Sequence, residues 1–254
     1  MNLPVGLRLE PARALKEKRL AALLAGRSES EPALQEVVRD AQLLGSLVLA
    51  GFAFAWEDVR GPSPAPEILD LRRAQTLTES ESPLTVAALL AWHEALEGPG
   101  KGWRRSERAR DGGPPPAPPA FVEGRLRLLE DWLRMDSGRE LRAAQAGALA
   151  LARILEVLPF DDANGRVSRL AVSHVMVRAG ERPPILVKGD RPRLVAALQA
   201  AFRLDTEPLS QLLEEASGRT IDVMISSVLR TVSPEDTAEL RKEKSLPSST
   251  NGTP

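Results

Sequence analysis

Residues 157–169 read VLPFDDANGRVSR and join one long apolar segment to another through a short polar loop. Two adjacent carboxylates, Asp161 and Asp162, precede Asn164 and Gly165, which are residue types that accept unusual backbone angles. Such a loop can aim several backbone N–H groups into one concavity at the start of the following helix, where the helix dipole favours negative charge. The stretch therefore predicts a site for phosphate or another anion between two helices.

Two arginines strengthen this prediction. Arg166 and Arg169 are three residues apart, so both fall on one face of the first turn of the expected helix and can reach phosphate oxygens from the same side. A neighbouring carboxylate can hold Mg²⁺ that is shared with the phosphates of a substrate. The residues thus favour a Mg-nucleotide site, and the alternative that stays open is a capped helix start with a surface network of Asp and Arg side chains.

The composition is that of a globular protein with a sizeable core, since 43% of the 254 residues are apolar and 27% are charged. Lys plus Arg is 34 against 35 for Asp plus Glu, so we expect neither nucleic acid nor an anionic membrane as partner. Cysteine is absent, which excludes disulfides, thiolate zinc sites and cysteine nucleophiles and favours a cytoplasmic location. Only 6 of the basic residues are Lys, a bias typical of a GC-rich bacterial genome.

No stretch approaches 18 uninterrupted apolar residues, and the first residues lack the apolar region of a signal peptide, so we expect neither a membrane span nor export. Apolar residues recur at three and four positions in the long segments, which predicts an all-α fold. The expected helices are 11–25, 32–56, 66–76, 84–97, 120–134, 138–157, 164–179, 191–202, 207–217 and 219–231. Start signals are Thr85, Asp190 and Thr206, and stop signals are Gly98, Gly180 and Gly218.

We expect three parts along the chain: a helical extension over 1–40, a helical domain over 41–232 and a disordered polar tail over 233–254. Whether the extension packs on the domain or on another molecule stays open, because amphipathic helices serve both purposes. Residues 98–120 form a Gly, Arg and Pro-rich insertion, which is typical of a binding loop or of a mobile surface loop.

The segment LPFDDANGRVSR resembles the signature of Fic (Fido-fold) proteins, H-x-F-x-[DE]-[GA]-N-[GK]-R-x-x-R. The matching positions are Phe160, Asp162, Ala163, Asn164, Gly165, Arg166 and Arg169, and Leu158 stands where the family has its His. The helical segment LTVAALLAWHEAL, the segment GKGWRR and the segment PPPAPPAFVEGRLRLLEDWL precede the motif in the family's usual order. The resemblance covers about residues 40–217.

The resemblance implies a Fido-fold helical bundle in which a short β-hairpin flap, within about 100–113, lies over the site. It also implies transfer of AMP from ATP to a Ser, Thr or Tyr hydroxyl of a target protein. Trp103 and Arg104 lie in the flap, which would hold that target or another partner protein. An aromatic and two arginines in a loop, such as Trp103 and the two residues after it, are more often a local packing and solvation solution than a partner contact. The oligomeric state cannot be read from the sequence.

Position by position, the resemblance implies that Asp162 holds Mg²⁺ and that the amides of residues 163–165 (Ala163, Asn164 and Gly165) cradle the α and β phosphates. Arg166 and Arg169 would reach the outer phosphates, and Phe160 would anchor the loop in the core.

Leu158 cannot take the proton that the family's His takes from the attacking hydroxyl, and such general-base help is typically worth about 10² to 10⁴-fold in rate. We expect His93 and His174 to be packed or surface residues. Asp161 could be a surrogate base only with an unusual aim and an unusual proton affinity.

A second departure lies upstream. The segment GSLVLAGFAF resembles the family's inhibitory helix, [ST]-x-x-x-E-[GN], with Ser46 and Gly51 in place and Ala50 at the position of the inhibitory Glu. That Glu would pair with the second motif Arg, so Arg169 would lack its intramolecular carboxylate. The alternative is an ordinary apolar core helix.

With both the base and the inhibitory carboxylate absent, the sequence favours a Fic-like pseudoenzyme, or a strongly impaired adenylyltransferase, that keeps a site for Mg²⁺ and ATP or another nucleotide. One alternative is an active transferase of AMP, or of another phosphate-containing group, that uses a different base. Another alternative is a protein-interaction module that binds no nucleotide.

Overall fold

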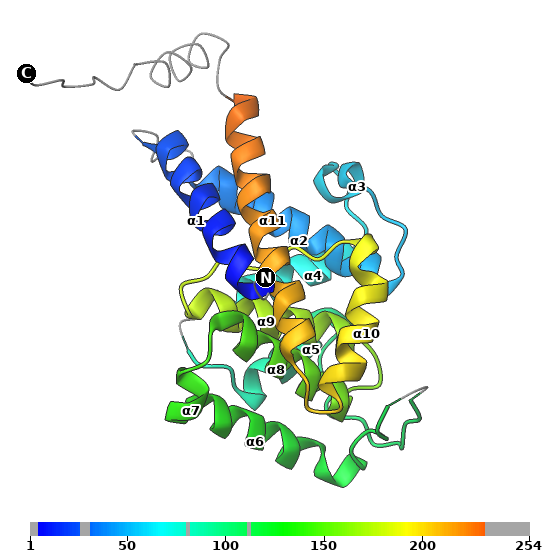
Figure 1. Ribbon diagram of the computed structural model, residues 1–254. Coiled ribbons are helices and arrows are strands. Elements are labelled where there is room, and N and C mark those ends of the chain that lie inside the picture. Colours follow the sequence, from blue (N-terminus) through cyan, green and yellow to red (C-terminus); the bar gives the residue numbers. More distant parts are fainter. Residues whose placement is uncertain (1–4, 26–30, 80–81, 111–112, 232–254) are drawn as a thin grey trace, which may run out of the picture.

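The structure is a computed structural model that describes residues 5–25, 31–79, 82–110 and 113–231. These residues form helices and connecting loops without any strand, so the prediction of an all-α fold is confirmed (Figure 1). The helices are α1 (Val5–Leu24), α2 (Glu31–Ala50), α3 (Trp56–Arg60), α4 (Pro66–Leu77), α5 (Val86–Glu97), α6 (Val122–Arg134), α7 (Asp136–Arg139), α8 (Ala143–Val157), α9 (Asn164–Arg178), α10 (Arg191–Ala201) and α11 (Glu207–Thr231), with short 3₁₀ turns η2 (Pro119–Phe121) and η3 (Lys188–Asp190). Among them, none has the length and apolar character needed to cross a membrane.

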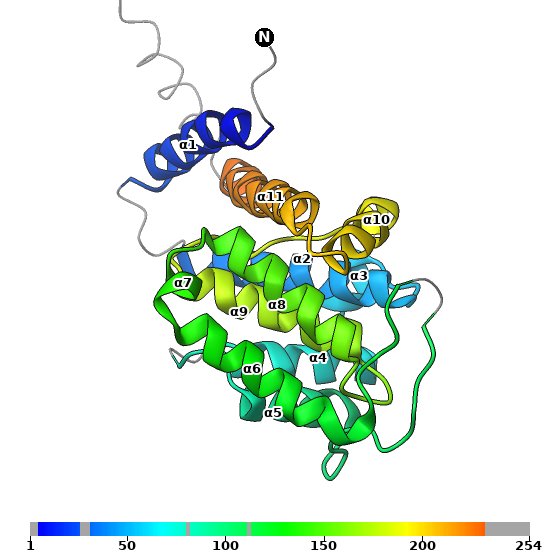
Figure 2. The same cartoon turned by 60° about the horizontal axis from the view of Figure 1, so that its bottom comes forward.

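Helices α8 and α9 lie side by side in the middle of the molecule (Figure 2). On one side α9 contacts α5 and α8 contacts α6, and on the other side α11 lies against α8 and α2. Helix α8 is rich in Ala and Gly, which lets its neighbours approach closely. A Cβ on Gly147, for example, would lie 3.3 Å from the Met176 side chain of α9 and 3.5 Å from Leu213 of α11. The connection between α8 and α9 therefore joins two closely packed helices.

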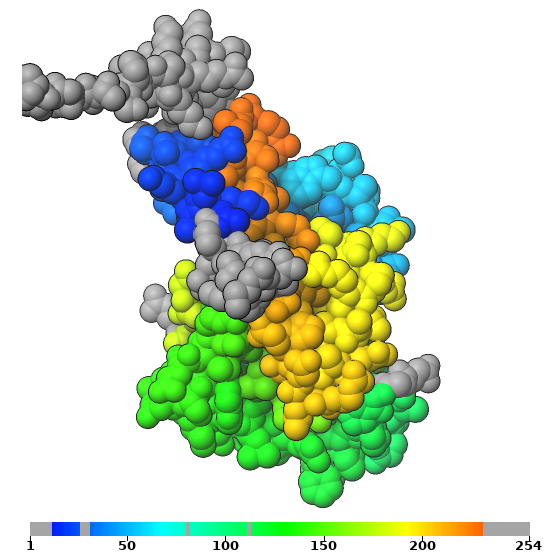
Figure 3. Space-filling model, in the orientation of Figure 1, coloured from blue at the N-terminus to red at the C-terminus, as the bar shows by residue number. Residues whose placement is uncertain are grey.

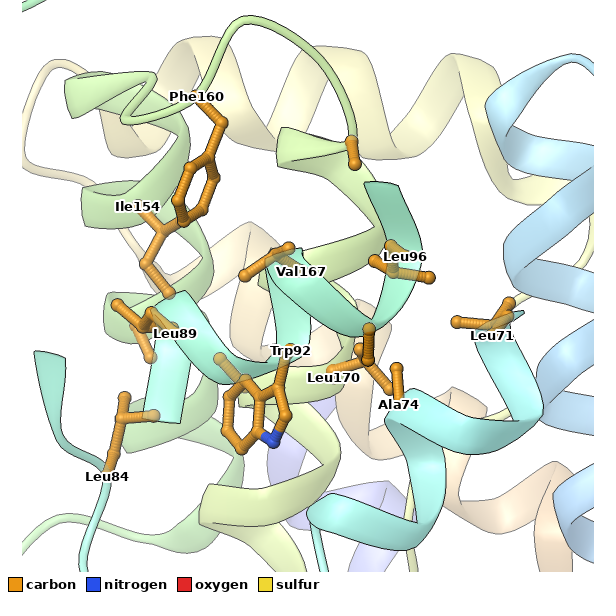
Figure 4. Close-up of a cluster of buried hydrophobic side chains, with 14 of the residues drawn as sticks. Leu71, Ala74, Leu84, Leu89, Trp92, Leu96, Ile154, Phe160, Val167 and Leu170 are labelled. Carbon is orange, nitrogen blue, oxygen red and sulfur yellow. The ribbon is translucent and has the colours of Figure 1, made fainter. Parts of the chain in front are cut away.

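The largest apolar cluster fills the space between α4, α5, α8 and α9 (Figure 4). Trp92, Ile154 and Phe160 are among its fully buried side chains. Burial of one such side chain contributes roughly 1.5 to 3 kcal/mol. Because Phe160 belongs to the loop and not to a helix, the core itself fixes where that loop starts.

A separate apolar cluster joins α1, the first half of α2 and the second half of α11. Helices α1 (blue) and α11 (orange) lie side by side (Figure 1). Its buried members are Leu20, Leu23, Leu34, Val38, Ile221, Met224, Ile225 and Val228. In the described part of the predicted extension, α1 thus packs on this same chain. The predicted boundary near residue 40 falls within α2, and the predicted tail over 233–254 lies outside the described residues.

Several predicted helix boundaries are wrong. The helix expected over 11–25 starts at Val5, and the helix expected over 138–157 is divided into α7 and α8. The helix expected over 32–56 ends at Ala50, because Gly51 takes a positive φ of 103° and the chain then turns before α3. The helices expected over 207–217 and 219–231 are one continuous α11, so Gly218 does not end a helix. A helical Gly costs only about 1 kcal/mol relative to Ala, less than the burial of the apolar residues on either side of it contributes.

Three other end signals behave as predicted, whereas the Asp190 side chain makes no capping hydrogen bond to α10. The Thr85 side chain accepts a hydrogen bond from the Ala88 amide at 3.0 Å, and Gly98 and Gly180 take positive φ values of 93° and 79° at the ends of α5 and α9.

The described residues of the predicted flap contain no strand, so the hairpin is not shown. In the space-filling view, the orange surface of α11 lies between the blue surface of α1 and the yellow surface of α10 (Figure 3).

Candidate functional site

The loop between α8 and α9 is bracketed by two left-handed residues. Leu158 caps α8 with φ 48° and ψ 66°, and Ala163 precedes α9 with φ 60° and ψ 4°. The expectation that Asn164 and Gly165 supply the unusual backbone angles is wrong, since both lie in the first turn of α9 without a positive φ. Asn164 contributes to the loop through its side chain, and Gly165 contributes through the absence of a side chain.

Asn164 closes the loop with its side-chain amide. Its Oδ1 accepts from the Phe160 backbone N–H at 2.9 Å, and its Nδ2 donates to the Phe160 carbonyl at 2.8 Å. The Phe160 ring is buried and stacks on His93, with ring centroids 3.9 Å apart, and on Trp103 at 5.2 Å. The loop is therefore tied at one residue through both its backbone and its side chain.

This arrangement exposes the donors at the start of α9. The first hydrogen bond of the helix runs from the Val167 amide to the Ala163 carbonyl at 2.9 Å, so the amides of residues 164–166 have no acceptor within the helix. Together with the helix dipole, such amides favour an anion. Asp162 is exposed beside them, with one carboxylate oxygen accepting from the Ala163 amide at 2.6 Å.

Arg169 lies against this helix start without an acidic partner. Its Nε donates to Ser46 Oγ at 2.9 Å and its Nη2 donates to the Ser46 carbonyl at 2.7 Å, and within the described residues it forms no ion pair. Burial, reinforced by the nearby positive charge of Arg166, lowers the pKa of Arg169 to about 9. A Cβ on Gly165 would lie 3.1 Å from Arg169 Nη1, so the missing side chain lets the guanidinium approach the helix start.

Arg166, by contrast, is paired. Its Nη2 donates to Glu97 Oε1 at 2.8 Å, and its guanidinium carbon lies 5.7 Å from the centre of the Phe52 ring. The sequence prediction missed both partners, because each lies far from the motif along the chain. One signal for Glu97 was available: it is the last residue of α5, where the helix dipole disfavours a negative charge unless a cation stands nearby.

The predicted remnant of an inhibitory helix lies at the end of α2. Ser46 is the residue that holds Arg169, as the hydrogen bonds above show. Ala50 is the exposed last residue of α2, and Gly51 turns the chain with its positive φ. The structure thus brings Ser46 to the loop, although the two are more than 100 residues apart.

Arg104 is not an exposed flap residue: only 1% of its surface is exposed, and its guanidinium contacts several backbone carbonyls. Its guanidinium donates to the carbonyls of Leu158 at 2.6 Å, Ser106 at 2.7 Å, Val157 at 3.3 Å and Ala117. Its backbone N–H donates to the Pro159 carbonyl at 2.9 Å. These contacts hold the end of α8 and both ends of the insertion together.

Neither histidine faces the loop as a free base. His93 is stacked on Phe160, its Nδ1 lies 3.1 Å from the Lys101 carbonyl, and burial lowers its pKa. His174 is buried with its two ring nitrogens each 2.9 Å from a carbonyl oxygen, those of Thr78 and Ser82.

Asp161 is exposed and lies 3.5 Å from Arg108. No cluster of three or more potential metal-ligating side chains occurs among the described residues.

Residues 83–176 match the model of the Fic/DOC family. The chain is 30% identical over 173 residues to the protein adenylyltransferase Fic of Culex quinquefasciatus, covering 63% of this chain and 34% of that protein. It is 29% identical over 151 residues to the protein of the same name from Drosophila melanogaster, covering 56% and 30%. The chain thus spans about a third of the length of these relatives.

Solved structures show the same fold. Fic-1 (residues 134–508) from C. elegans superposes with a TM-score of 0.69 at 21% identity, over 88% of this chain and 76% of that one. A Fic family protein from Desulfovibrio desulfuricans G20 superposes with a TM-score of 0.67 at 20% identity, over 95% and 80%. Residues 83–176 thus match the Fic/DOC family model, and the described chain shares its fold with these solved Fic structures.

Proposed function

We propose that this chain binds a nucleotide, ATP or another phosphate-bearing ligand, at the start of α9 and that its capacity for AMP transfer is impaired or absent. The observation that carries the binding half is Arg169, a largely desolvated cation with no carboxylate partner in the described residues, beside free backbone amides. A buried charge without an opposite charge is costly unless something compensates it. An anion at the helix start would supply that compensation.

Asp162 fits a role in holding Mg²⁺. Its carboxylate is exposed, and within the described residues only one of its oxygens accepts a hydrogen bond. Mg²⁺ takes hard oxygen ligands of this kind. One or two protein carboxylates suffice for Mg²⁺ when substrate phosphates and waters complete its shell. The ion would neutralise phosphate charge, while Arg166, Arg169 and the amides of residues 164–166 would orient the phosphates.

Leu158 carries the second half of the proposal. It stands at the family's base position, and its side chain has no atom that can take a proton. Asp161, the surrogate suggested by the sequence, is exposed and faces Arg108 instead of being held in a desolvated position. Loss of a general base costs typically about 10² to 10⁴-fold in rate, which motivates impairment without excluding slow turnover.

The binding half is tested by calorimetric titration of the protein with ATP, ADP, AMP and CTP, each with and without Mg²⁺. We expect micromolar, Mg-dependent binding of at least one nucleotide. Arg169→Ala should weaken it at least about tenfold, because a hydrogen bond to a charged group contributes about 1.5 to 3 kcal/mol. Arg178→Ala, an exposed arginine in the last turn of the same helix, is the matched control and should bind as the wild type does. A folded wild type that binds none of the four would contradict the proposal.

The catalytic half is tested with Leu158→His and the control Leu158→Asn, because Asn accepts a left-handed backbone but is no base at neutral pH. The assay follows transfer of labelled AMP from ATP to this chain or to added protein. We expect Leu158→His to raise the rate about 10² to 10⁴-fold and Leu158→Asn to leave it unchanged. Transfer by the wild type as fast as by Leu158→His would favour the alternative of an active transferase with another base.

The interaction-module alternative stays distinguishable. It requires no nucleotide binding by the wild type and no effect of Asp162→Ala or Arg166→Ala on any measured affinity for a protein partner.

In the proposed function, residues 100–113 would act as the flap, taking up hairpin geometry over a target or partner chain. The absence of cysteine favours a reducing compartment such as the cytoplasm.

A further inference from the structure

We propose that Glu97 is a specificity-determining residue of the phosphate site: its carboxylate limits how much negative charge a bound ligand can carry. The inference rests on the proposed function, since it assumes that phosphate binds beside Arg166 and Arg169. It assigns a role to a residue of α5, outside the loop and outside the motif that marks the site.

The contact that carries the inference is the ion pair between Glu97 Oε1 and Arg166 Nη2 at 2.8 Å. The Arg166 side chain is 8% exposed and that of Glu97 is 18% exposed, so water screens the pair only weakly. Lys101 also approaches Glu97, at 3.6 Å, but its side chain is 60% exposed and contributes little. Arg166 is therefore the main partner of Glu97, and its charge is already balanced within the chain.

The two arginines of the site thus differ in their charge balance. Arg169 has only the hydroxyl and carbonyl of Ser46 as partners, whereas Arg166 has a carboxylate. Arg169 and the backbone amides at the start of α9 can balance the charge of a ligand with one or two negative charges. A ligand with four or five charges must also use Arg166, and its outer phosphates then come close to the Glu97 carboxylate. Repulsion between like charges in a weakly screened place increases with the ligand's charge.

A purely structural role for Glu97, holding the Arg166 side chain in place, makes a different prediction. The Glu97→Gln variant distinguishes this structural role from the proposed effect of charge. The Gln carbonyl oxygen can still accept a hydrogen bond from Arg166 Nη2, while the negative charge is gone. If Glu97 only positioned Arg166, the Gln variant would bind all phosphates as the wild type does, or more weakly. If its charge sets specificity, the variant binds more tightly, and the gain rises along the series of ligands.

The experiment is calorimetric titration with inorganic phosphate, pyrophosphate and tripolyphosphate, probes that share one chemistry and differ in charge. For Glu97→Gln we expect a gain in affinity of about threefold for phosphate and about tenfold or more for tripolyphosphate. The gain should shrink when KCl is raised from roughly 0.05 to 0.5 M, because salt screens the repulsion. Glu94→Gln, one turn earlier on α5 and without contact to Arg166, is the matched control and should show no gain. Glu97→Asp keeps the charge and should keep the discrimination of the wild type.

Thermal unfolding gives a second readout. Without ligand, Glu97→Gln should melt below the wild type, because Arg166 loses its counter-charge next to Arg169, and tripolyphosphate should raise its Tm more than that of the wild type. Wild-type binding with no charge-dependent gain in folded Glu97→Gln would overturn the inference and leave the proposed function standing. Absence of any phosphate binding in wild type and variant alike would overturn both.

Discussion

At the scale of single residues, the loop depends on two side-chain-bearing residues in left-handed conformation. A left-handed residue other than Gly costs roughly 1 to 2 kcal/mol, and Leu158 and Ala163 both carry that cost. Two contacts offset it: the Arg104 guanidinium binds the Leu158 carbonyl, and the Asn164 side chain holds the Phe160 backbone. Strain of this kind persists only where the surroundings enforce it, and it collects at functional sites.

His93 gives the fold a pH dependence. Burial lowers its pKa below the ordinary 6.5, so between the two values the unfolded chain binds a proton that the folded protein does not. Stability therefore falls as the pH drops through and below 6.5. We expect His93→Asn, which keeps a donor for the Lys101 carbonyl, to lose less Tm than the wild type between pH 7.5 and pH 5.5. Melting curves by circular dichroism check this, and parallel pH profiles of the two proteins would contradict it.

The position of the motif between the end of one helix and the start of the next could be predicted, because the motif residues are contiguous and their spacing is typical of a helix start. Ser46, from the segment compared with the inhibitory helix, contacts Arg169, although the sequence predicted no contact between these two residues. Glu97 could not be paired with Arg166 in advance, since that contact depends on how α5 packs against α9. The resemblance placed Arg104 in the flap, whereas the structure buries it against four backbone carbonyls, a packing arrangement that depends on contacts distant in sequence.

At the scale of elements, two helical glycines differ in how much space surrounds them. A Cβ on Gly218 in α11 would meet nothing within 4 Å, whereas one on Gly45 in α2 would lie 2.0 Å from the Leu186 carbonyl oxygen. We expect Gly218→Ala to raise the free energy of unfolding by about 0.5 to 1 kcal/mol, because Ala loses less backbone entropy on folding. Gly45→Ala should instead lower it by about 1 to 3 kcal/mol, since backbone must move to make room. Urea unfolding measures both, and a destabilising Gly218→Ala would argue against a continuous α11.

The same comparison explains which elements the sequence predicts well. Periodic apolar residues predict helices such as α5 and α9 to within a few residues, because burial of one face decides their existence. The positions of the helix ends depend on local backbone conformation and on packing, neither of which apolar periodicity predicts. Gly51 ends α2 because its backbone takes a positive φ, and Gly218 fails to end α11 because packing on both sides continues the helix.

At the scale of the whole molecule, the cluster between α1, α2 and α11 is separate from the core that holds the loop. Leu20 is 1% exposed in that cluster, so Leu20→Ala should lower the free energy of unfolding by about 2 to 5 kcal/mol. Nucleotide affinity, measured at a temperature where the variant is folded, should not change. Leu15→Ala, 69% exposed on the same helix, is the control and should stay within about 0.5 kcal/mol of the wild type. A loss of affinity in folded Leu20→Ala would show that the two clusters are coupled.

The contacts of Arg104 also bear on how this chain can vary. One guanidinium holds the carbonyls of Ser106 and Ala117, so the residues between them form a closed loop whose two ends are fixed at a single point next to Leu158. The entropy of closing such a loop grows only with the logarithm of its length, and doubling it costs about 0.6 kcal/mol. Insertions and deletions that spare the contacts of Arg108 with Asp161 and of Arg110 with Leu155 and Glu156 can therefore accumulate between these two residues at little cost in free energy, and this surface can diverge while the backbone at Leu158 keeps its geometry.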